Sequence, residues 1–140
     1  MDPYASGKFS ANLFTEKCGV TGKLVAILNG YLEDRGLKLI VQPSRCIRAG
    51  DVHELIVTDE GDKKGGDTVN RIASLGFFAA DNSGVIVAGD TLRINNETFG
   101  VVLGFDETHC PNHINIVVHL PERTTGAEAG LQLQSNVYFT

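Results

Sequence analysis

Glycine residues and short apolar runs alternate along most of this chain. Its 140 residues include 16 glycines, which are spread between the apolar runs rather than gathered in one tract. Glycines placed in this way are typical of turns and bulges between short strands, because glycine adopts backbone conformations that other residues avoid. The alternation is most regular over residues 84–120, where turn signals separate successive apolar runs. This pattern predicts a mainly β protein.

The spacing of the turn signals indicates the architecture. We expect strands at 8–14, 37–42, 52–58, 74–80, 85–88, 91–94, 98–105, 114–120 and 131–140. Short strands that recur about every eight to twelve residues are typical of a compact β-barrel or sandwich, here of antiparallel strands. A chain of this length can bury a core of its own, so we expect a single domain over 1–140, with residues 1–8 as a mobile arm.

Residues 21–35 depart from the strand pattern. Six apolar residues recur here at helical spacing: Val20, Leu24, Ile27, Leu28, Tyr31 and Leu32. The dipeptide Asn29-Gly30 favours a hairpin instead, because this pair is a strong two-residue turn signal. Six positions outweigh one dipeptide, so we predict one helix near the N-terminus. The charged loop at 59–67 has a composition that fits a lid, a hairpin tip or an exposed loop without a role.

Two glycine turns resemble each other. Residues 47–51 (IRAGD) and 86–90 (IVAGD) each precede an apolar run. In both, the glycine can adopt a positive φ, and the aspartate can accept hydrogen bonds from backbone amides beyond the turn. We interpret the repeat as barrel construction rather than as a site.

Charge and cysteine content exclude several classes of protein. A net charge of −5 and a pI near 5.3 argue against nucleic-acid binding, which requires a basic surface. The sequence has no apolar segment of the roughly 20 residues needed to cross a membrane, and its first residues do not resemble a secretory signal. Cys18, Cys46 and Cys110 are odd in number and widely spaced, so we expect reduced thiols in a cytoplasmic protein.

The loop at 105–113 (FDETHCPNH) carries the densest set of reactive side chains. We take Asp106, Glu107, His109 and His113 as candidates for ligand binding. Cys110 and His113 have C-x-x-H spacing beside His109, so these three residues are the candidates for a divalent transition metal.

Two further interpretations of this loop stay open. A structural zinc site normally has four ligands, so Cys46 or His53 would have to join the loop residues. Cys110 could instead act as a nucleophile beside a histidine base, or the loop side chains could serve packing alone.

The second half of the chain resembles the glucitol/sorbitol-specific enzyme IIA of the bacterial sugar phosphotransferase system. The shared order is a glycine turn and strand at 88–94, an aromatic-led strand at 99–104 and a histidine-led strand at 112–116. The resemblance implies a small β-barrel in a sugar-uptake or regulatory setting. That family carries its phosphoryl group on a histidine near the position of Phe77 or Phe78 here, and 76–84 contains no histidine. The resemblance therefore implies a relative without the carrier step.

Three functions are compatible with these features. The first is a non-enzymatic β-barrel module that binds a small molecule or a protein partner, favoured because the chain lacks the common nucleotide-binding and hydrolase motifs. The second is a phosphocarrier that uses His113 or His109, and the third is a metal protein that uses the 105–113 loop. We also expect a homo-oligomer, because a strand over 131–139 would leave an edge that a second copy could cover.

Overall fold

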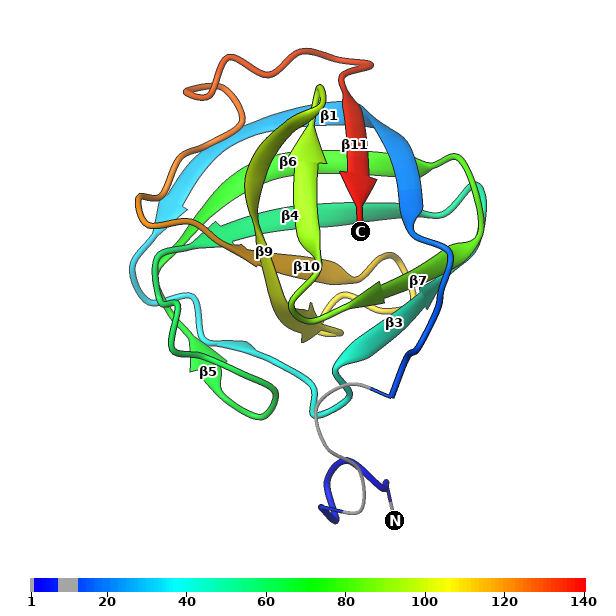
Figure 1. The fold of residues 1–140 in the computed structure, drawn as a ribbon. Coiled ribbons are helices and arrows are strands. Elements are labelled where there is room, and N and C mark those ends of the chain that lie inside the picture. Colours follow the sequence, from blue (N-terminus) through cyan, green and yellow to red (C-terminus); the bar gives the residue numbers. More distant parts are fainter. Residues whose placement is uncertain (1, 8–12) are drawn as a thin grey trace.

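The regular structure of the protein consists of strands. The computed structural model describes residues 2–7 and 13–140, and this part of the chain forms eleven strands and no helix (Figure 1). The strands are β1 (Val20–Leu32), β2 (Leu37–Lys38), β3 (Ser44–Ile47), β4 (Val52–Thr58), β5 (Thr68–Val69), β6 (Ile72–Ala80), β7 (Gly84–Val87), β8 (Thr91–Ile94), β9 (Glu97–Asp106), β10 (Asn115–His119) and β11 (Asn136–Phe139). The described residues accordingly hold no helix that could span a membrane. The strand expected at 8–14 and the arm expected at 1–8 fall in part on residues 1 and 8–12, outside the described residues.

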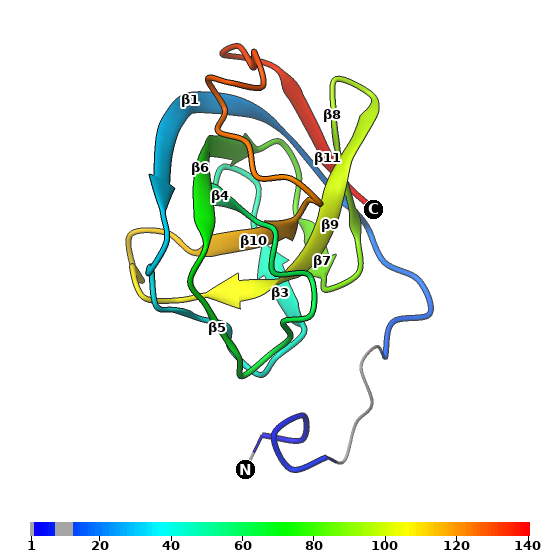
Figure 2. The ribbon, with the colours of Figure 1, turned by 90° about the vertical axis from the view of Figure 1, so that its left-hand side faces the viewer.

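Seven of the strands of the described chain close into a barrel. Their order around the wall is β1-β11-β8-β9-β10-β4-β6, and β6 pairs again with β1 (Figures 1 and 2). All neighbours are antiparallel except β10 and β4, which run parallel. Two small sheets, β2-β5 and β3-β7, lie outside this ring. The prediction of a mainly β barrel is confirmed, whereas the parallel pair departs from the expected antiparallel strands.

The predicted helix at 21–35 is wrong. This segment is the long strand β1, which pairs with β6 along its length and with β11 at its start. Its register against β6 shifts between Leu24 and Ala26 and again between Ile27 and Gly30. Each shift changes the phase of the two-residue alternation, so the apolar residues of a bulged strand imitate helical spacing. The close pairing of β1 with β6 requires glycine at position 22, because a Cβ there would lie 2.3 Å from the carbonyl oxygen of Ala79.

Other strand boundaries differ from the prediction to varying degrees. The strands expected at 52–58 and 91–94 are confirmed to the residue. The strand expected at 37–42 is limited to Leu37–Lys38, because Leu39 bonds to the loop at Gly66 and Asp67 and Ile40 makes a single bond to Phe105 of β9. The strand expected at 131–140 is limited to Asn136–Phe139 and pairs on both sides, with β1 and β8. The free edge from which we expected a second copy to bind is therefore absent from the described barrel.

The wall of the barrel separates two apolar cores. The larger core fills the interior, where Phe78, Phe105 and Phe139 are fully buried. The smaller core lies on the outer face of β4 and β10, beneath the β2-β5 sheet. Its members are Leu37, Leu39, Ile56, Ile72, Val69 and Val117. Because β2 and β5 are held by this second core, the chain that joins β2 to β3 is fixed against the outside of the wall.

The two predicted glycine turns are confirmed and have a third counterpart. Gly50, Gly89 and Gly66 have φ of 92°, 98° and 93°. The aspartate that follows each glycine accepts a hydrogen bond from the backbone amide three residues before it, at 2.9–3.0 Å. The carboxylate therefore closes the turn from within rather than bonding beyond it. The third turn, 64–67, ends the charged loop at 59–67, for which the sequence is compatible with a lid, a hairpin tip or no role.

The stability of the fold should depend on pH through the ion pair between Asp59, just after β4, and Arg71, just before β6. Arg71 donates to Asp59 from Nε and Nη2, and this bonding holds the pKa of Asp59 below its usual value. A depressed carboxyl pKa stabilises the fold above the ordinary pKa of 3.8, and this contribution disappears as the pH falls through the folded-state pKa. Asp59→Asn should therefore lower the free energy of unfolding at pH 7 by only about 0.5–1 kcal/mol, because the pair is partly exposed. Below pH 4 the loss should be smaller, since the Asp59 carboxylate of the wild type is then being protonated.

Urea unfolding at a series of pH values from 7 to 3 measures this difference. Asp62→Asn is the matched control, because Asp62 is exposed and forms no ion pair within the described chain. An identical dependence on pH for wild type and Asp59→Asn would contradict the assignment.

Candidate functional site

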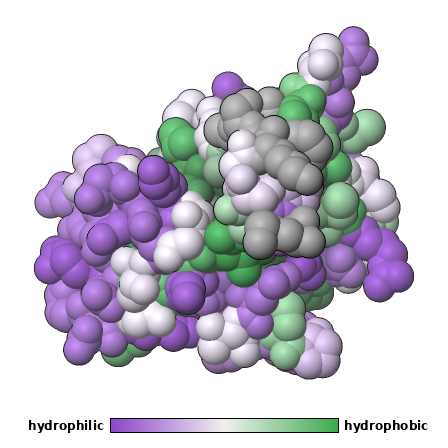
Figure 3. Space-filling model, turned by 90° about the horizontal axis from the view of Figure 1, so that it is seen from below, coloured by the Kyte–Doolittle hydropathy of each residue, from purple (hydrophilic) through white to green (hydrophobic). Residues whose placement is uncertain are grey.

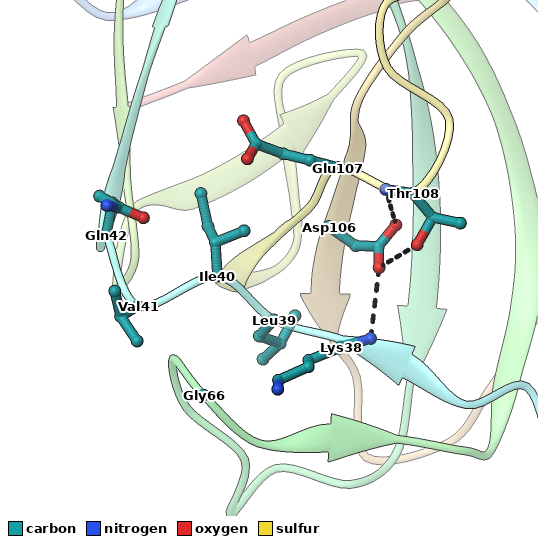
Figure 4. Close-up of a pocket in the computed structure, with 9 residues that line it drawn as sticks. All are labelled: Lys38, Leu39, Ile40, Val41, Gln42, Gly66, Asp106, Glu107 and Thr108. Atoms are coloured by element: carbon teal, nitrogen blue, oxygen red, sulfur yellow. Dashed lines mark hydrogen bonds between the residues drawn. The ribbon is translucent and has the colours of Figure 1, made fainter. Parts of the chain in front are cut away.

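A pocket of about 420 Å³ opens on the outside of the barrel, between the chain that follows β2 and the loop that follows β9 (Figure 4). It is lined by Lys38, Leu39, Ile40, Val41, Gln42, Gly66, Asp106, Glu107 and Thr108. Its centre is aliphatic and its rim carries charged and polar side chains. This composition is typical of sites for small molecules, which combine an apolar surface with a few polar groups that fix orientation.

Asp106 anchors the wall of this pocket. Its carboxylate is 1% exposed and accepts four hydrogen bonds of 2.8–3.2 Å. The donors are the backbone amides of Lys38 and Thr108, the Thr108 hydroxyl and the Asn115 side chain. The carboxylate thus joins the end of β9 to β2 and β10. Its oxygens are occupied, so Asp106 shapes the pocket rather than offering a free acceptor to a ligand.

The rim of the pocket carries one cation without a partner. Glu107 is exposed and pairs with Arg45 of β3, so its charge is largely compensated. The Lys38 ammonium forms no ion pair or hydrogen bond with any described residue. Figure 4 shows its side chain extending toward the segment of Gly66, on the opposite side of the pocket from Glu107. The free charge available to a ligand here is therefore positive.

A second pocket of about 400 Å³ adjoins the first. Both are lined by Ile40, Val41 and Gln42, so the extended chain over these residues forms a ridge between them. Lys64 lies on the far side of the second pocket and, like Lys38, has no ion-pair partner among the described residues. Tyr4 also lines it, and Gln42 donates to Asp2 at 2.6 Å. Figure 3, which views the molecule from below, shows hydrophobic surface at the centre of this face beside a hydrophilic lobe.

The two candidate histidines of the 105–113 loop lie together, apart from Asp106 and Glu107. The rings of His109 and His113 have centroids 5.2 Å apart, and the edge of Phe77 packs against His113 at 5.0 Å. His109 is exposed and its Nε2 lies 3.3 Å from the guanidinium of Arg35. His113 is buried, with Nε2 3.4 Å from a carboxylate oxygen of Glu54. The loop therefore divides into a pocket wall at 106–108 and a histidine pair at 109–113.

Burial governs the charge of the groups around this pair. It raises the pKa of Glu54 above its usual value, although His113 acts in the opposite direction. Burial likewise lowers the pKa of His53, against the effect of Asp51. His53 points into the barrel and its Nδ1 accepts a 3.0 Å hydrogen bond from the backbone of Ile114. Its role is therefore structural, on the opposite face of β4 from Glu54.

The three cysteines do not join the histidines. Cys18, Cys46 and Cys110 are free and exposed. Within residues 2–7 and 13–140, no three or more His, Cys, Asp or Glu side chains gather as ligands for one metal ion.

Sequence reasoning missed Lys38, Lys64 and Glu54. The lysines were not singled out because their proximity to the loop depends on long-range packing. Glu54 carried a signal, since it interrupts the apolar run of the β4 strand at a position that turns out to be half-buried.

The fold and the pocket define a small closed β-barrel with a ligand-sized pocket on its outer wall. The chain belongs to the DUF6917 family, a family of unknown function, whose model matches residues 14–140. No curated protein and no solved structure matches the chain. The similarity to enzyme IIA of the phosphotransferase system stays a prediction. At the two positions that its phosphohistidine would occupy, Phe78 packs in the barrel interior and Phe77 contacts His113.

Proposed function

We propose that the protein is a non-enzymatic binding module for a small amphipathic anion. The observation that carries this proposal is the pair of adjoining pockets, each with an unpaired lysine beside the same aliphatic ridge. The ridge of Ile40 and Val41 supplies apolar contact, and Val41 is 41% exposed before any ligand binds. Covering such a side chain is favourable by roughly 25 cal/mol per Å² of apolar surface removed from water.

The lysines select the charge of the ligand. The chain is acidic overall, so an anion would be repelled from most of its surface. Lys38 and Lys64 are local exceptions, because neither ammonium is neutralised by a described carboxylate. A carboxylate or phosphate joined to an apolar body would meet a positive charge at the rim and aliphatic side chains at the centre. We place this binding in the cytoplasm, a setting supported by three exposed free thiols.

Decanoate is a suitable probe, with decanol as its uncharged counterpart. We expect saturable binding of decanoate in isothermal titration calorimetry and competition with the dye 8-anilinonaphthalene-1-sulfonate. The double variant Lys38→Met, Lys64→Met should weaken decanoate binding about tenfold, or 1.4 kcal/mol, because two attractive charges are lost. Decanol binding should be unchanged.

Lys23→Met is the matched control for this test. Lys23 is a partly exposed lysine of β1 whose pairing with Asp81 lies away from the pockets. Its replacement should leave decanoate affinity unaltered. Absence of saturable binding, or equal losses in the control and the double variant, would refute the proposed function.

A further inference from the structure

Two buried polar atoms in the described part of the chain have no hydrogen-bond partner, and both belong to neighbours of Glu54. They are Nε2 of His113 and Oδ1 of Asn115. Asn115 is fully buried and His113 is 9% exposed. Buried polar atoms nearly always have partners, so two orphans in one place are expected to be satisfied by a bound water or ion. This place lies behind the pocket wall and is separate from the ridge described above.

The register of β10 places Asn115, with its orphan oxygen, beside Glu54. Asn115 of β10 is paired in register with Asp106 on one side and with Glu54 on the other. Its Nδ2 donates to Asp106 at 3.1 Å, which fixes the amide because the reversed orientation would set two oxygens against each other. Oδ1 is consequently the amide atom left without a partner, on a residue whose register neighbour on β4 is Glu54.

The separation of His113 and Glu54 suits two ligands of one ion. Nε2 and Oε1 are 3.4 Å apart, longer than an ordinary N–H···O hydrogen bond. Two ligand atoms that are each about 2.0–2.1 Å from a tetrahedral ion are themselves about 3.3–3.4 Å apart. The observed separation is therefore typical of neighbouring metal ligands.

A neighbour is also available to orient the imidazole of His113. Its Nδ1 lies 2.7 Å from Nδ2 of Asn112, and reversing this exposed amide would bring its oxygen to Nδ1 instead. With the amide oxygen toward Nδ1, that nitrogen donates and Nε2 keeps its lone pair for a metal. A metal-bound histidine usually donates its other ring N–H in this way.

We propose that Glu54, His113 and Asn115 bind one divalent first-row transition metal ion. The donors are a carboxylate, an imidazole nitrogen and an amide oxygen, a mixed set that suits ions such as Co²⁺ or Zn²⁺. Water or a substrate group would complete the coordination. Glu54 forms no ion pair with a lysine or arginine of the described chain, so its charge is available to the ion. Cys110 and His109, which the sequence suggested as ligands, are exposed and play no part in this site.

Titration of the tag-free, chelator-treated protein with Co²⁺ tests the site. We expect stoichiometric binding, visible absorption bands of protein-bound Co²⁺ and a higher unfolding temperature with the ion. Glu54→Gln and His113→Gln should each reduce affinity at least tenfold, whereas Cys110→Ser and His109→Gln should leave it unchanged. Arg35→Gln should strengthen binding, because it removes the positive charge that contacts His109.

Three outcomes would overturn the proposal. They are an absence of saturable Co²⁺ binding to the wild type, unchanged affinity in Glu54→Gln, and a loss in Cys110→Ser that equals the loss in His113→Gln. Glu54→Gln is nearly isosteric, so it keeps the test decisive if His113→Gln fails to fold. Because Lys38 and Lys64 are not ligands, decanoate binding tests the proposed function separately.

Discussion

Asp106→Ala should destabilise the protein by about 2–4 kcal/mol and abolish binding in the first pocket. The substitution leaves four donors without their acceptor, among them the backbone amide of Lys38 and the buried amide of Asn115. Each unsatisfied buried donor costs about 1–3 kcal/mol, reduced where water can enter. Urea unfolding and decanoate titration measure the two effects.

Glu107→Ala provides the matched control for Asp106→Ala. Glu107 is the next residue along the chain and lines the same pocket, but it is exposed and its pairing with Arg45 is partly solvated. We expect a change below about 1 kcal/mol, as for other surface ion pairs. If both variants lost the same stability, Asp106 would not be the anchor of the loop.

Phe78→Ala should have the largest effect on stability, about 3–5 kcal/mol. Phe78 is fully buried in the barrel interior and packs against Phe139 with ring centroids 5.4 Å apart. Such a loss is a large fraction of the roughly 5–15 kcal/mol that stabilises a typical domain. Chemical unfolding followed by circular dichroism would measure it.

Phe77→Ala is the natural comparison, because the adjacent side chain lies on the outer face of the wall. Phe77 is half-buried and contacts His113. We expect a smaller loss, about 1–2 kcal/mol, because less apolar surface leaves contact. A larger loss in Phe77→Ala than in Phe78→Ala would contradict the assignment of the inner and outer faces.

The sequence predicted most of the barrel because its strands are short and bounded by local turn chemistry. The glycine-aspartate turns at 47–51 and 86–90 depend on four-residue geometry, which is legible without tertiary information. The prediction of a helix in place of β1 is wrong for a different reason. Its two register shifts are set by pairing with β6, and a pattern based on one strand alone cannot contain them.

The candidate site was predicted in part. The 105–113 loop does line a pocket, but the partners of its side chains come from β2, β4 and β10. Spacing within the loop favoured Cys110 with His113, whereas the fold sets His113 beside Glu54, a residue far away in the sequence. Proximity of this kind arises from the parallel pairing of β4 with β10, which has no local signature in the sequence.

The place of β11 in the wall determines when the protein can fold during its synthesis. β11 lies between β1 and β8, and its register pairs Val20 with Phe139. Until residues 136–139 leave the ribosome, β1 and β8 each present an unpaired edge to other chains. Exposed edges favour association between nascent molecules. Barrel closure therefore waits for residues 136–139, and both edges stay open to other chains until β11 is in place.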